Sequence, residues 1–315
     1  MCKTTYCELR ATSIHIYNMM NPQKKSGTLW VAICYVVALA GAYWALISIE
    51  TEQTILKTLA ADVVATAIVF GFSIAFKNAS FYDPYWSVAP LPIAIYWKYQ
   101  YAPGDWMLQE ILLLIIIAWW SIRLTLNWYR GWEGIRHEDW RYGDLKKKTG
   151  YFYPLVNFLG IHLFPTLLVF LGCLPIIGFF DSFSGGKDSI SNVRWFLFAA
   201  GALTGFIAPI IQFIADEQMR KHRQSSQNNY IDSGLWKYSR HPNYFGEILF
   251  WTSLLLMGLS SANFQWWMAS GVVAMILLFV FISSPMMEQR ILEKYPDYIV
   301  YQKKVSMLIP WFRKK

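Results

Sequence analysis

The densest group of chemically useful residues lies between residues 216 and 247, in the sequence DEQMRKHRQSSQNNYIDSGLWKYSRHPNYFGE. Asp216, Arg220 and Arg223 follow one another at intervals of four and three residues, which places them on one face of a helix. Arginine suits phosphate recognition because its guanidinium presents a planar fork of N–H donors. The segment therefore predicts an anion-binding helix face, with snorkelling cations as the purely structural alternative.

A second group follows in YSRHPNYFGE, residues 238–247. Pro242 suits the first residue of a helix, so Asn243 and Glu247 would lie one turn apart on the same wall, beside Gly246. An amide that donates and accepts, next to a carboxylate that accepts, suits a carboxamide such as that of nicotinamide. Gly246 would let the nicotinamide ring approach the helix. The structural alternative is a helix-start pair that only orders the preceding loop.

A third group of ionisable residues follows Arg123, in RLTLNWYRGWEGIRHEDWRYGD. Charge pairs of Asp139 with Arg130 or Arg141 would order this loop without any chemistry. Earlier in the chain, Asp83 suits a helix N-cap and Pro84 a helix start. The functional alternative for Asp83 is a carboxylate at the mouth of a cavity.

The composition shows what kind of scaffold positions these residues. The chain has 315 residues, of which 55% are apolar, 18% aromatic and only 15% charged, and its mean hydropathy is +0.29. Soluble domains carry about 25% charged residues. These values exclude a water-soluble enzyme and a disordered chain. The net charge of +8 is explained by basic cytoplasmic loops and predicts no nucleic-acid partner. The four cysteines form no CxxC pair and predict no metal site.

Long charge-free runs predict an all-α polytopic transmembrane helical bundle. The longest run, 248–287, is sufficient for two crossings because one crossing takes roughly 20 apolar residues. We expect about eight spans, with seven as the alternative, in a single membrane domain over residues 28–315 that follows a polar segment, 1–27. The expected spans are 28–49, 55–76, 84–98, 106–129, 152–180, 194–215, 243–260 and 264–285.

The distribution of basic residues supports eight spans. Of the 28 lysines and arginines, 22 lie in four segments. These segments are 1–27, 130–148, 216–247 and 288–315. Eight spans place all four segments on one side, which the positive-inside rule identifies as the cytoplasm. Seven spans would put the two chain ends on opposite sides. We therefore expect an integral protein of a bacterial inner membrane or the endoplasmic reticulum, with both termini cytoplasmic.

The segment GLWKYSRHPNYFGE, with ADEQMRKHR upstream, resembles the C-terminal region of the steroid 5α-reductase superfamily, and more closely an uncharacterised bacterial-type branch of it. The resemblance covers roughly residues 80–315. It implies an all-helical membrane reductase that uses NADPH, with the cofactor region in 194–315. The residues that it assigns to the cofactor are Asp216, Arg220, Arg223, Tyr238, Arg240, His241, Asn243, Tyr244, Glu247, Arg290 and Tyr298.

The same resemblance implies reduction of a carbon–carbon double bond conjugated to a carbonyl, in a steroid-like or other lipid-soluble substrate. The chain departs from the family at Trp120, where a tyrosine would precede Arg123 by three residues, and the family's Gln-Glu pair has no clear match. The expected partners are the substrate and membrane lipid, and no obligate protein partner is implied. The expected catalytic residues are Asp83, Tyr85, Arg123, Glu138 and Tyr142.

A second enzyme class shares part of this pattern. Isoprenylcysteine carboxyl methyltransferases have a similar Arg-His-Pro-x-Tyr-x-Gly stretch, followed by a Glu and several tyrosines before a terminal Pro. In this chain residues 240–246 and 288–310 would then serve S-adenosylmethionine. Asn243 and Glu247 favour the reductase. The alternative function is thus a membrane methyltransferase, and a non-catalytic lipid-binding protein is the third possibility.

Overall fold

The computed structural model describes residues 22–182, 194–225 and 229–313. Every regular element in these ranges is a helix, and the one β-type pairing found there is an isolated bridge between Ser239 and Ser306. Within the described part of the chain, six helices are long and apolar enough to cross a membrane. The chain is therefore an all-α polytopic protein, as the sequence predicts. The six are Pro22–Ser48, Thr54–Ala75, Leu108–Gly131, Trp140–Asp181, Trp195–Gln224 and Trp266–Lys294.

The described residues form two compact units, between which the chain passes more than once. Unit 1 contains the residues up to Ala89 together with Thr125–Leu167, and unit 2 contains Pro90–Leu124 together with the residues from Leu168 onwards. The elements of unit 1 are α2 (Pro22–Ser48), α3 (Thr54–Ala75), η1 (Ala79–Phe81), α4 (Tyr85–Val88), α7 (Trp140–Thr149), η2 (Gly150–Phe152), α8 (Tyr153–Val156) and η3 (Asn157–Leu163).

Two helices contribute residues to both units, namely α6 (Leu108–Gly131) and α9 (Phe164–Cys173). The remaining elements belong to unit 2. They are α5 (Pro90–Tyr101), α10 (Pro175–Asp181), α11 (Trp195–Gln224), η5 (Gly234–Lys237), α12 (Pro242–Leu259), η6 (Trp266–Ala269), α13 (Ser270–Leu278), η7 (Phe279–Ser283), α14 (Ser284–Lys294) and α15 (Tyr298–Lys304).

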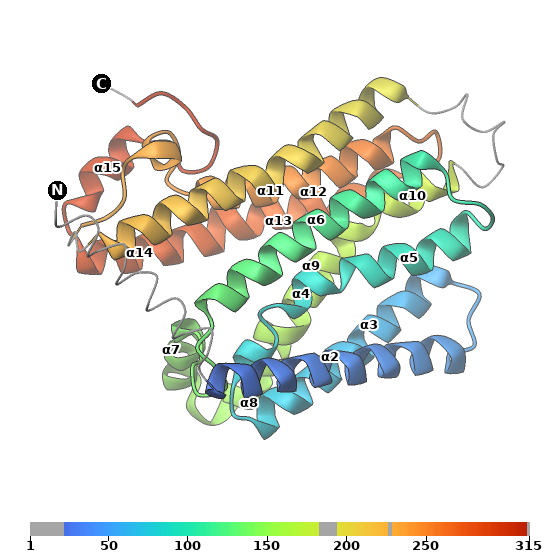
Figure 1. Ribbon diagram of the computed structural model, residues 1–315, viewed down its shortest axis with the longest axis horizontal. Coiled ribbons are helices and arrows are strands. Elements are labelled where there is room, and N and C mark those ends of the chain that lie inside the picture. Colours follow the sequence, from blue (N-terminus) through green and yellow to red (C-terminus); the bar gives the residue numbers. More distant parts are fainter. Residues whose placement is uncertain (1–21, 183–193, 226–228, 314–315) are drawn as a thin grey trace. The chain divides into compact units, whose positions relative to one another are not determined.

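In unit 1, α2 and α3 lie side by side as a helical hairpin (Figure 1). Their close approach depends on Gly41, because a Cβ there would come within 2.2 Å of a methyl group of Ile68. The outer face of α2 carries large apolar side chains that remain exposed, including Leu29, Val36 and Ile47. Exposed aliphatic side chains along a whole helix are typical of a surface that faces lipid.

Residues 153–181 form one interrupted helical stretch, as the three prolines in 152–180 predict. Its first interruption is η3, a π-helix over Asn157–Leu163 in which the helical turn is wider than in an α-helix. Pro175 then begins α10 after a break at Leu174. The π-helix lies next to α3 in unit 1.

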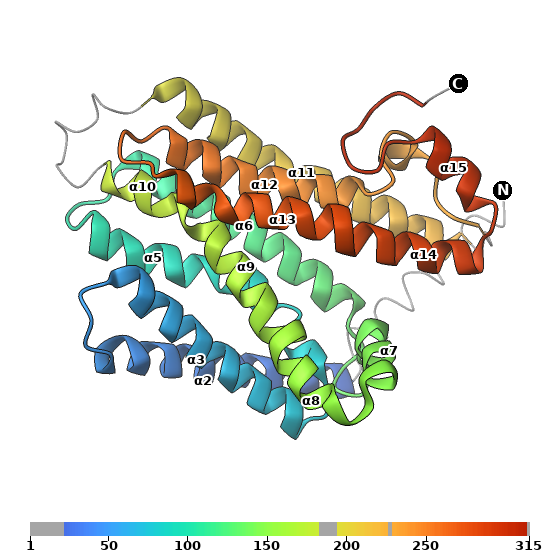
Figure 2. The same cartoon turned by 180° about the vertical axis from the view of Figure 1, so that it is seen from behind.

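In unit 2, α11 and α12 form the most closely packed helix pair, and α13 lies beside them in both views (Figures 1 and 2). Gly201 and Gly205 allow this approach. A Cβ at Gly201 would lie 2.9 Å from the carbonyl oxygen of Ser253, and one at Gly205 would lie 3.0 Å from the Ser253 hydroxyl. Two glycines four residues apart are a common way to bring membrane helices into backbone contact.

The two ends of unit 2 are fixed by different contacts. At one end, the Asn263 amide donates to Asp181 at 2.6 Å and the Arg194 amide N–H donates to the Ser260 carbonyl at 2.8 Å. At the other end, the segment before α12 pairs with the segment after α15, through Ser239 and Ser306. The basic segments 216–247 and 288–313 therefore share one end of unit 2, as the charge distribution predicts.

Two expected elements differ in the structure. The expected span 84–98 is split at Ala89 into α4, of four residues, and α5, of 12 residues. Prolines at 84, 90 and 92 account for the split, because proline lacks the N–H that continues a helix. The expected loop 130–148 contains helix α7, which begins after Asp139. Eight spans therefore remain a prediction.

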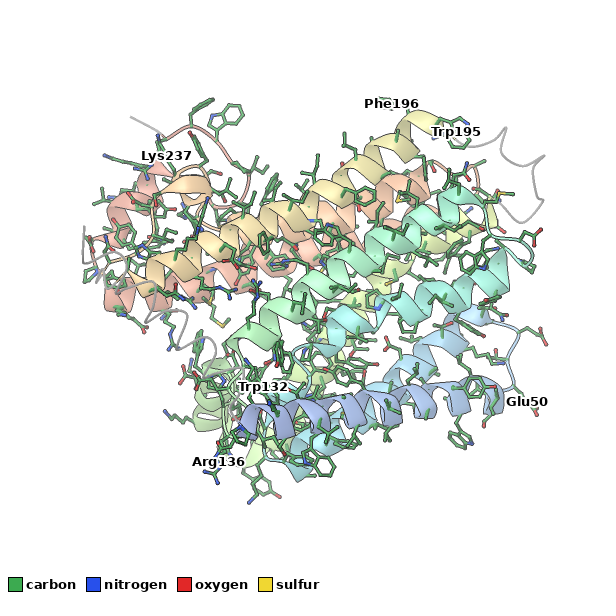
Figure 3. All side chains as sticks on the ribbon, viewed as in Figure 1. Glu50, Trp132, Arg136, Trp195, Phe196 and Lys237 are labelled. Atoms are coloured by element: carbon green, nitrogen blue, oxygen red, sulfur yellow. The ribbon has the colours of Figure 1, made fainter. Side chains whose placement is uncertain are left out.

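Aromatic side chains mark the beginning of two helices of unit 2. Figure 3 shows Trp195 and Phe196 at the start of α11, where their exposed fractions are 44% and 83%. Trp266, at the start of η6 and α13, has an exposed fraction of 84%. Exposed tryptophan at the end of an apolar helix is typical of a membrane–water interface.

Candidate functional site

The first cluster of the candidate site joins α6 to α11. The Arg123 guanidinium donates through Nη1 to the Gln212 side-chain oxygen at 2.7 Å, and through Nη2 to the Asp216 carboxylate. Arg123 is 7% exposed and Gln212 only 1% exposed. Asp216, expected to bind cofactor, and Arg123, expected to act in catalysis, are thus an ion pair within one polar network.

Glu247 occupies the centre of this network. Its Oε2 accepts from Gln212 Nε2 at 2.6 Å and from the Trp120 indole N–H at 3.1 Å, while its Oε1 accepts from the Trp251 indole N–H at 3.0 Å. The side chain is 5% exposed and receives donors from α6, α11 and α12. Three donors stabilise a carboxylate at a depth where an unpaired one would be costly.

Gly246 serves helix packing and leaves no open wall. A Cβ at this position would lie 2.5 Å from Gln212 Cγ and 3.0 Å from the carbonyl oxygen of Ala208. Because α11 fills this space, the expectation that Gly246 lets a nicotinamide ring approach α12 is wrong. The glycine instead brings Gln212 within reach of Glu247.

Asn243 is the least satisfied residue of the candidate site. It lies in the first turn of α12, which begins at Pro242 as the sequence predicts. Its Oδ1 is buried and has no hydrogen-bond partner. The neighbouring Tyr244 ring stacks on His241, with 5.1 Å between ring centroids. An orphaned buried acceptor at the start of a helix is suited to a ligand N–H.

Glu288 on α14 holds together the segment that precedes α12. It accepts from Arg240 Nε at 2.6 Å, His241 Nε2 lies 2.9 Å from it, and Gln302 donates to it at 2.7 Å. Arg240 Nη1 also donates to the carbonyl oxygens of Gln302 and Val305, both at 2.7 Å. Arg240 and His241 are thus committed to protein partners. A role of either in binding cofactor remains a prediction.

The arginines at the end of α11 are more accessible. The helix continues to Gln224, so Arg220 and Arg223 lie on the predicted helical extension. Arg220 pairs with Glu217 at 3.3 Å, and Arg223 is exposed. Both guanidinium groups lie in the last five residues of α11, which ends at Gln224.

The other expected cofactor residues lie around the C-terminal segment. Tyr298 is 2% exposed and packs against Tyr230 and Tyr301. Burial raises the pKa of Tyr298 above that of a free phenol. Tyr238 packs against Phe312, and Arg290 is exposed on α14. None of these observations tests the cofactor assignment.

In unit 1 the structure brings two expected catalytic residues together. The Tyr142 hydroxyl, on α7, donates to the Asp83 carboxylate. Asp83 does not cap α4, whose N-terminal flanking residue is Pro84 and has no side-chain cap. The expected N-cap is therefore wrong, because Tyr142 takes the carboxylate instead. Burial raises the pKa of Asp83 to about 6, although the hydrogen bond from Tyr142 opposes the rise.

This pKa predicts a pH-dependent contribution to stability. Folded Asp83 keeps its proton up to about pH 6, whereas an unfolded chain releases it near about pH 4. The folded state then binds more protons, so stability is lost as pH rises from about 4 to about 6. As pH rises over this range, we expect the melting temperature of the parent to fall relative to that of Asp83→Asn. A difference that is independent of pH, measured in detergent, would contradict the shift.

The remaining expected catalytic residues have other partners. Glu138 Oε1 accepts from the backbone N–H of Ala79 at 2.8 Å. The Tyr85 hydroxyl donates to Asp62 Oδ1 at 2.7 Å. Asp62 was not among the expected site residues, and neither was Gln212. Asp62 is a carboxylic acid and Gln212 an amide in the apolar part of a long helix, and the rarity of such side chains there was the signal that could have identified them.

The expected ordering of the 130–148 loop is present. Asp139 accepts from Arg141 Nε at 2.8 Å and from Arg141 Nη2 at 3.0 Å, and it also caps α7 by accepting from the Arg141 backbone N–H. A bidentate pair at a helix N-terminus fixes where α7 begins. Because α7 carries Tyr142, this pair positions the tyrosine that contacts Asp83.

Comparison with known proteins gives a family but no activity. The family model described as "Protein of unknown function (DUF1295)" matches residues 69–305. The chain is similar to Uncharacterized protein C594.04c of Schizosaccharomyces pombe, with 25% identity over 268 residues that cover 77% of this chain and 76% of the yeast protein. No solved structure matches the chain.

Proposed function

We propose that this chain, which belongs to the DUF1295 family, is a membrane-embedded NADPH-dependent reductase. Its substrate would be a lipid with a carbon–carbon double bond conjugated to a carbonyl. The observation that carries the proposal is the buried, unpartnered Oδ1 of Asn243, one helical turn before the carboxylate of Glu247. The resemblance of residues 215–247 to the steroid 5α-reductase superfamily supports the same reading.

The residues fit the nicotinamide carboxamide in chemical terms. Its NH₂ group can donate to Asn243 Oδ1, which has no other donor. A carboxylate offers about four acceptor positions, and Glu247 uses three of them for Trp120, Gln212 and Trp251. One position, on Oε1, is therefore left for a ligand. Arg220 and Arg223 would hold the phosphates by charge-assisted hydrogen bonds.

The cofactor, when bound, supplies a hydride for the substrate. The protein must then stabilise the negative charge that develops on the substrate oxygen and provide a proton. A hydroxyl held by a carboxylate is the kind of group that can do this, and the expectation from the sequence assigns the role to Tyr142 and Asp83, which are hydrogen-bonded to each other within unit 1. An apolar helical scaffold supports the choice of a lipid-soluble substrate, because such a substrate reaches the site through the bilayer.

The methyltransferase alternative is supported by one observation. Residues 240–241 and Glu288, which that class would use together, are in direct contact. Ligand-dependent thermal stabilisation of the detergent-purified protein separates the two classes. We expect NADPH to raise the melting temperature and S-adenosylmethionine to leave it unchanged. The reverse result would identify a methyltransferase, and stabilisation by neither would contradict both enzymes.

Selectivity for NADPH over NADH is expected to depend on Arg223. Because Arg240 is engaged by Glu288, the extra phosphate of NADPH falls to Arg220 and Arg223. Loss of one charge-assisted contact weakens binding by about 1.5–3 kcal/mol. Arg223→Ala should thus weaken NADPH roughly tenfold or more and leave NADH little changed. Arg194→Ala, an exposed arginine at the opposite end of α11, is the control. Equal weakening of both nucleotides would argue against a role in phosphate selection.

We also propose that both chain termini lie in the cytoplasm. The proposal rests on the 22 of 28 basic residues that eight spans would place on one side. Reporter fusions after residue 315 and within 181–193 are expected to lie on opposite sides of the membrane. Two reporters on the same side would require a different number of spans.

A further inference from the structure

A buried polar cluster lies inside unit 1, apart from the residues assigned to the cofactor. It is formed by three elements that are distant in sequence, namely α3, the η1–α4 turn, and the π-helix η3 with the start of α9. Its members are Asp62, Thr66, Tyr82, Tyr85, Asn157, His162 and Thr166. All seven are buried, although most of the surrounding residues in these helices are apolar. We name this group the Asp62–His162 cluster.

Hydrogen bonds and ring contacts make the cluster continuous. The Tyr82 and Thr66 hydroxyls lie 2.8 and 2.9 Å from Thr166 Oγ1. The Tyr82 ring then links the two ends, because its centroid is 5.5 Å from the Tyr85 ring and 4.9 Å from the His162 ring. Tyr85 in turn donates to Asp62 Oδ1.

The hydroxyl protons of the cluster all have acceptors. Thr166 donates to the His162 carbonyl oxygen at 2.9 Å, so its Oγ1 accepts from Tyr82 and from Thr66. The Tyr85 proton goes to Asp62. No hydroxyl of these four residues is left with a proton to give.

Three acceptor atoms, by contrast, have no partner. They are Asp62 Oδ2, Asn157 Oδ1 and His162 Nε2. The residues are 6%, 2% and 0% exposed. His162 Nδ1 lies 3.1 Å from the Asn157 carbonyl oxygen, which can only accept, so Nδ1 carries the ring proton and Nε2 is an acceptor in the neutral ring. Asn157 Oδ1 and His162 Nε2 are therefore buried acceptors that no donor of the cluster reaches.

Such an imbalance is unfavourable unless a ligand corrects it. An unsatisfied buried polar group lowers stability, and ionisable residues within membrane helices are retained mainly where they are used. Asn157 and His162 both lie on a π-helix, a feature that is frequent at functional sites because it re-aims side chains. The ring of Phe70, 5.3 Å from His162, adds an apolar wall.

We propose that the Asp62–His162 cluster binds the hydroxyl group of a lipid-soluble alcohol. A hydroxyl brings the missing donor, whereas a ketone or an ether brings none. An ammonium group also donates, but it would carry a full charge into membrane-spanning helices. The apolar body of an alcohol can pack against the aromatic rings, and its single polar end matches the acceptors. Such a site needs no cofactor, and the proposal does not depend on whether the chain reduces a double bond.

The test compares each alcohol with its own methyl ether. Detergent-purified full-length protein is titrated with farnesol and with cholesterol, and separately with the methyl ether of each, and apparent affinities are taken from thermal stabilisation. We expect at least one alcohol to bind roughly tenfold or more tightly than its ether, because the ether cannot donate. Equal affinities within both pairs, or no stabilisation by either alcohol, would overturn the proposal and leave the cluster to ordered water.

Variants locate the effect. His162→Phe keeps a ring beside Tyr82 but removes Nε2, and Asp62→Leu removes Oδ2. The hydroxyl has one proton to donate, so the change that removes its acceptor should reduce the alcohol-over-ether preference to about threefold or less, and the other change should affect it less. Ser73→Ala is the matched control, since Ser73 is buried with an unpartnered hydroxyl in the same helix α3, roughly 16 Å along it. An unchanged preference in both variants would place the alcohol elsewhere. If neither variant folds, the comparison in the parent protein still decides.

Discussion

Replacing Glu247 with alanine is expected to lower the free energy of unfolding by about 3–5 kcal/mol. The substitution would leave three buried donors, on Trp120, Gln212 and Trp251, without an acceptor. It would also open a cavity between α6, α11 and α12, which water could fill only in part. Unfolding by a denaturing detergent, followed by tryptophan fluorescence, measures the loss directly because two of the donors are indoles.

Glu293→Ala is the control for this prediction. Glu293 is exposed on α14, and its only described hydrogen bond is a long one of 3.4 Å from Gln289. Its removal should change the free energy of unfolding by less than about 0.5 kcal/mol. A loss below about 1 kcal/mol for Glu247→Ala would mean that the three donors find other partners, and the central role of Glu247 would be wrong.

The network also changes what Glu247→Gln can be expected to show. From the sequence, a purely structural glutamate would tolerate glutamine. Because both oxygens of Glu247 accept from N–H groups, the new NH₂ of glutamine must face a donor on one side. Some loss of stability is thus expected in either case, and NADPH affinity must be measured on the fraction that stays folded. Affinity equal to that of the parent would contradict a cofactor role.

Arg240→Ala is expected to have the second largest effect, a loss of about 3–5 kcal/mol of unfolding free energy. It would leave the carboxylate of Glu288, 7% exposed, without its strongest partner and would free the carbonyl oxygens of Gln302 and Val305. The segment before α12 would then lose its attachment to α14 and α15. Thermal unfolding and limited proteolysis near residue 305 report the two consequences separately.

Two further variants define what Arg240 contributes. Arg240→Lys should recover little of the stability that Arg240→Ala loses, because a lysine cannot present the fork that reaches Glu288 and two carbonyls together. Arg313→Ala removes an exposed arginine that pairs with Asp232 at 3.2 Å, and it should cost less than about 1 kcal/mol. Equal losses of unfolding free energy for Arg240→Ala and Arg313→Ala would contradict a structural role for the contacts of Arg240 with Glu288, Gln302 and Val305.

Local signals in the sequence predicted much of the fold. Apolar runs located the long helices, although α2 begins six residues before its expected span and α11 ends nine residues after it, and Pro242 marked the start of α12. Helical spacing placed Asp216, Arg220 and Arg223 on an extension of α11, which the structure contains. These features depend on composition and on neighbours along the chain, so one sequence is sufficient to find them.

Pairings between distant segments could not be predicted in this way. Asp62 meets Tyr85 across 23 residues, and Gln212 meets Glu247 across 35. Nothing in the local pattern says which polar side chain on one apolar helix faces which on another. The role of Gly246 was missed for the same reason, because its neighbour Gln212 lies on a different helix.

The π-helix at Asn157–Leu163 also limits how the length of this chain can vary. A turn of this kind accommodates one residue more than an α-helical turn. Deleting a single codon within it would restore an ordinary α-helix and leave the two flanking stretches facing nearly the same way, because the wider turn had already absorbed the extra residue. The same deletion in an α-helical turn would rotate the preceding residues by about 100° relative to the following ones. The π-helix is thus the part of this stretch where one residue can be lost while Tyr153–Val156 and the residues around Thr166 keep their relative orientation.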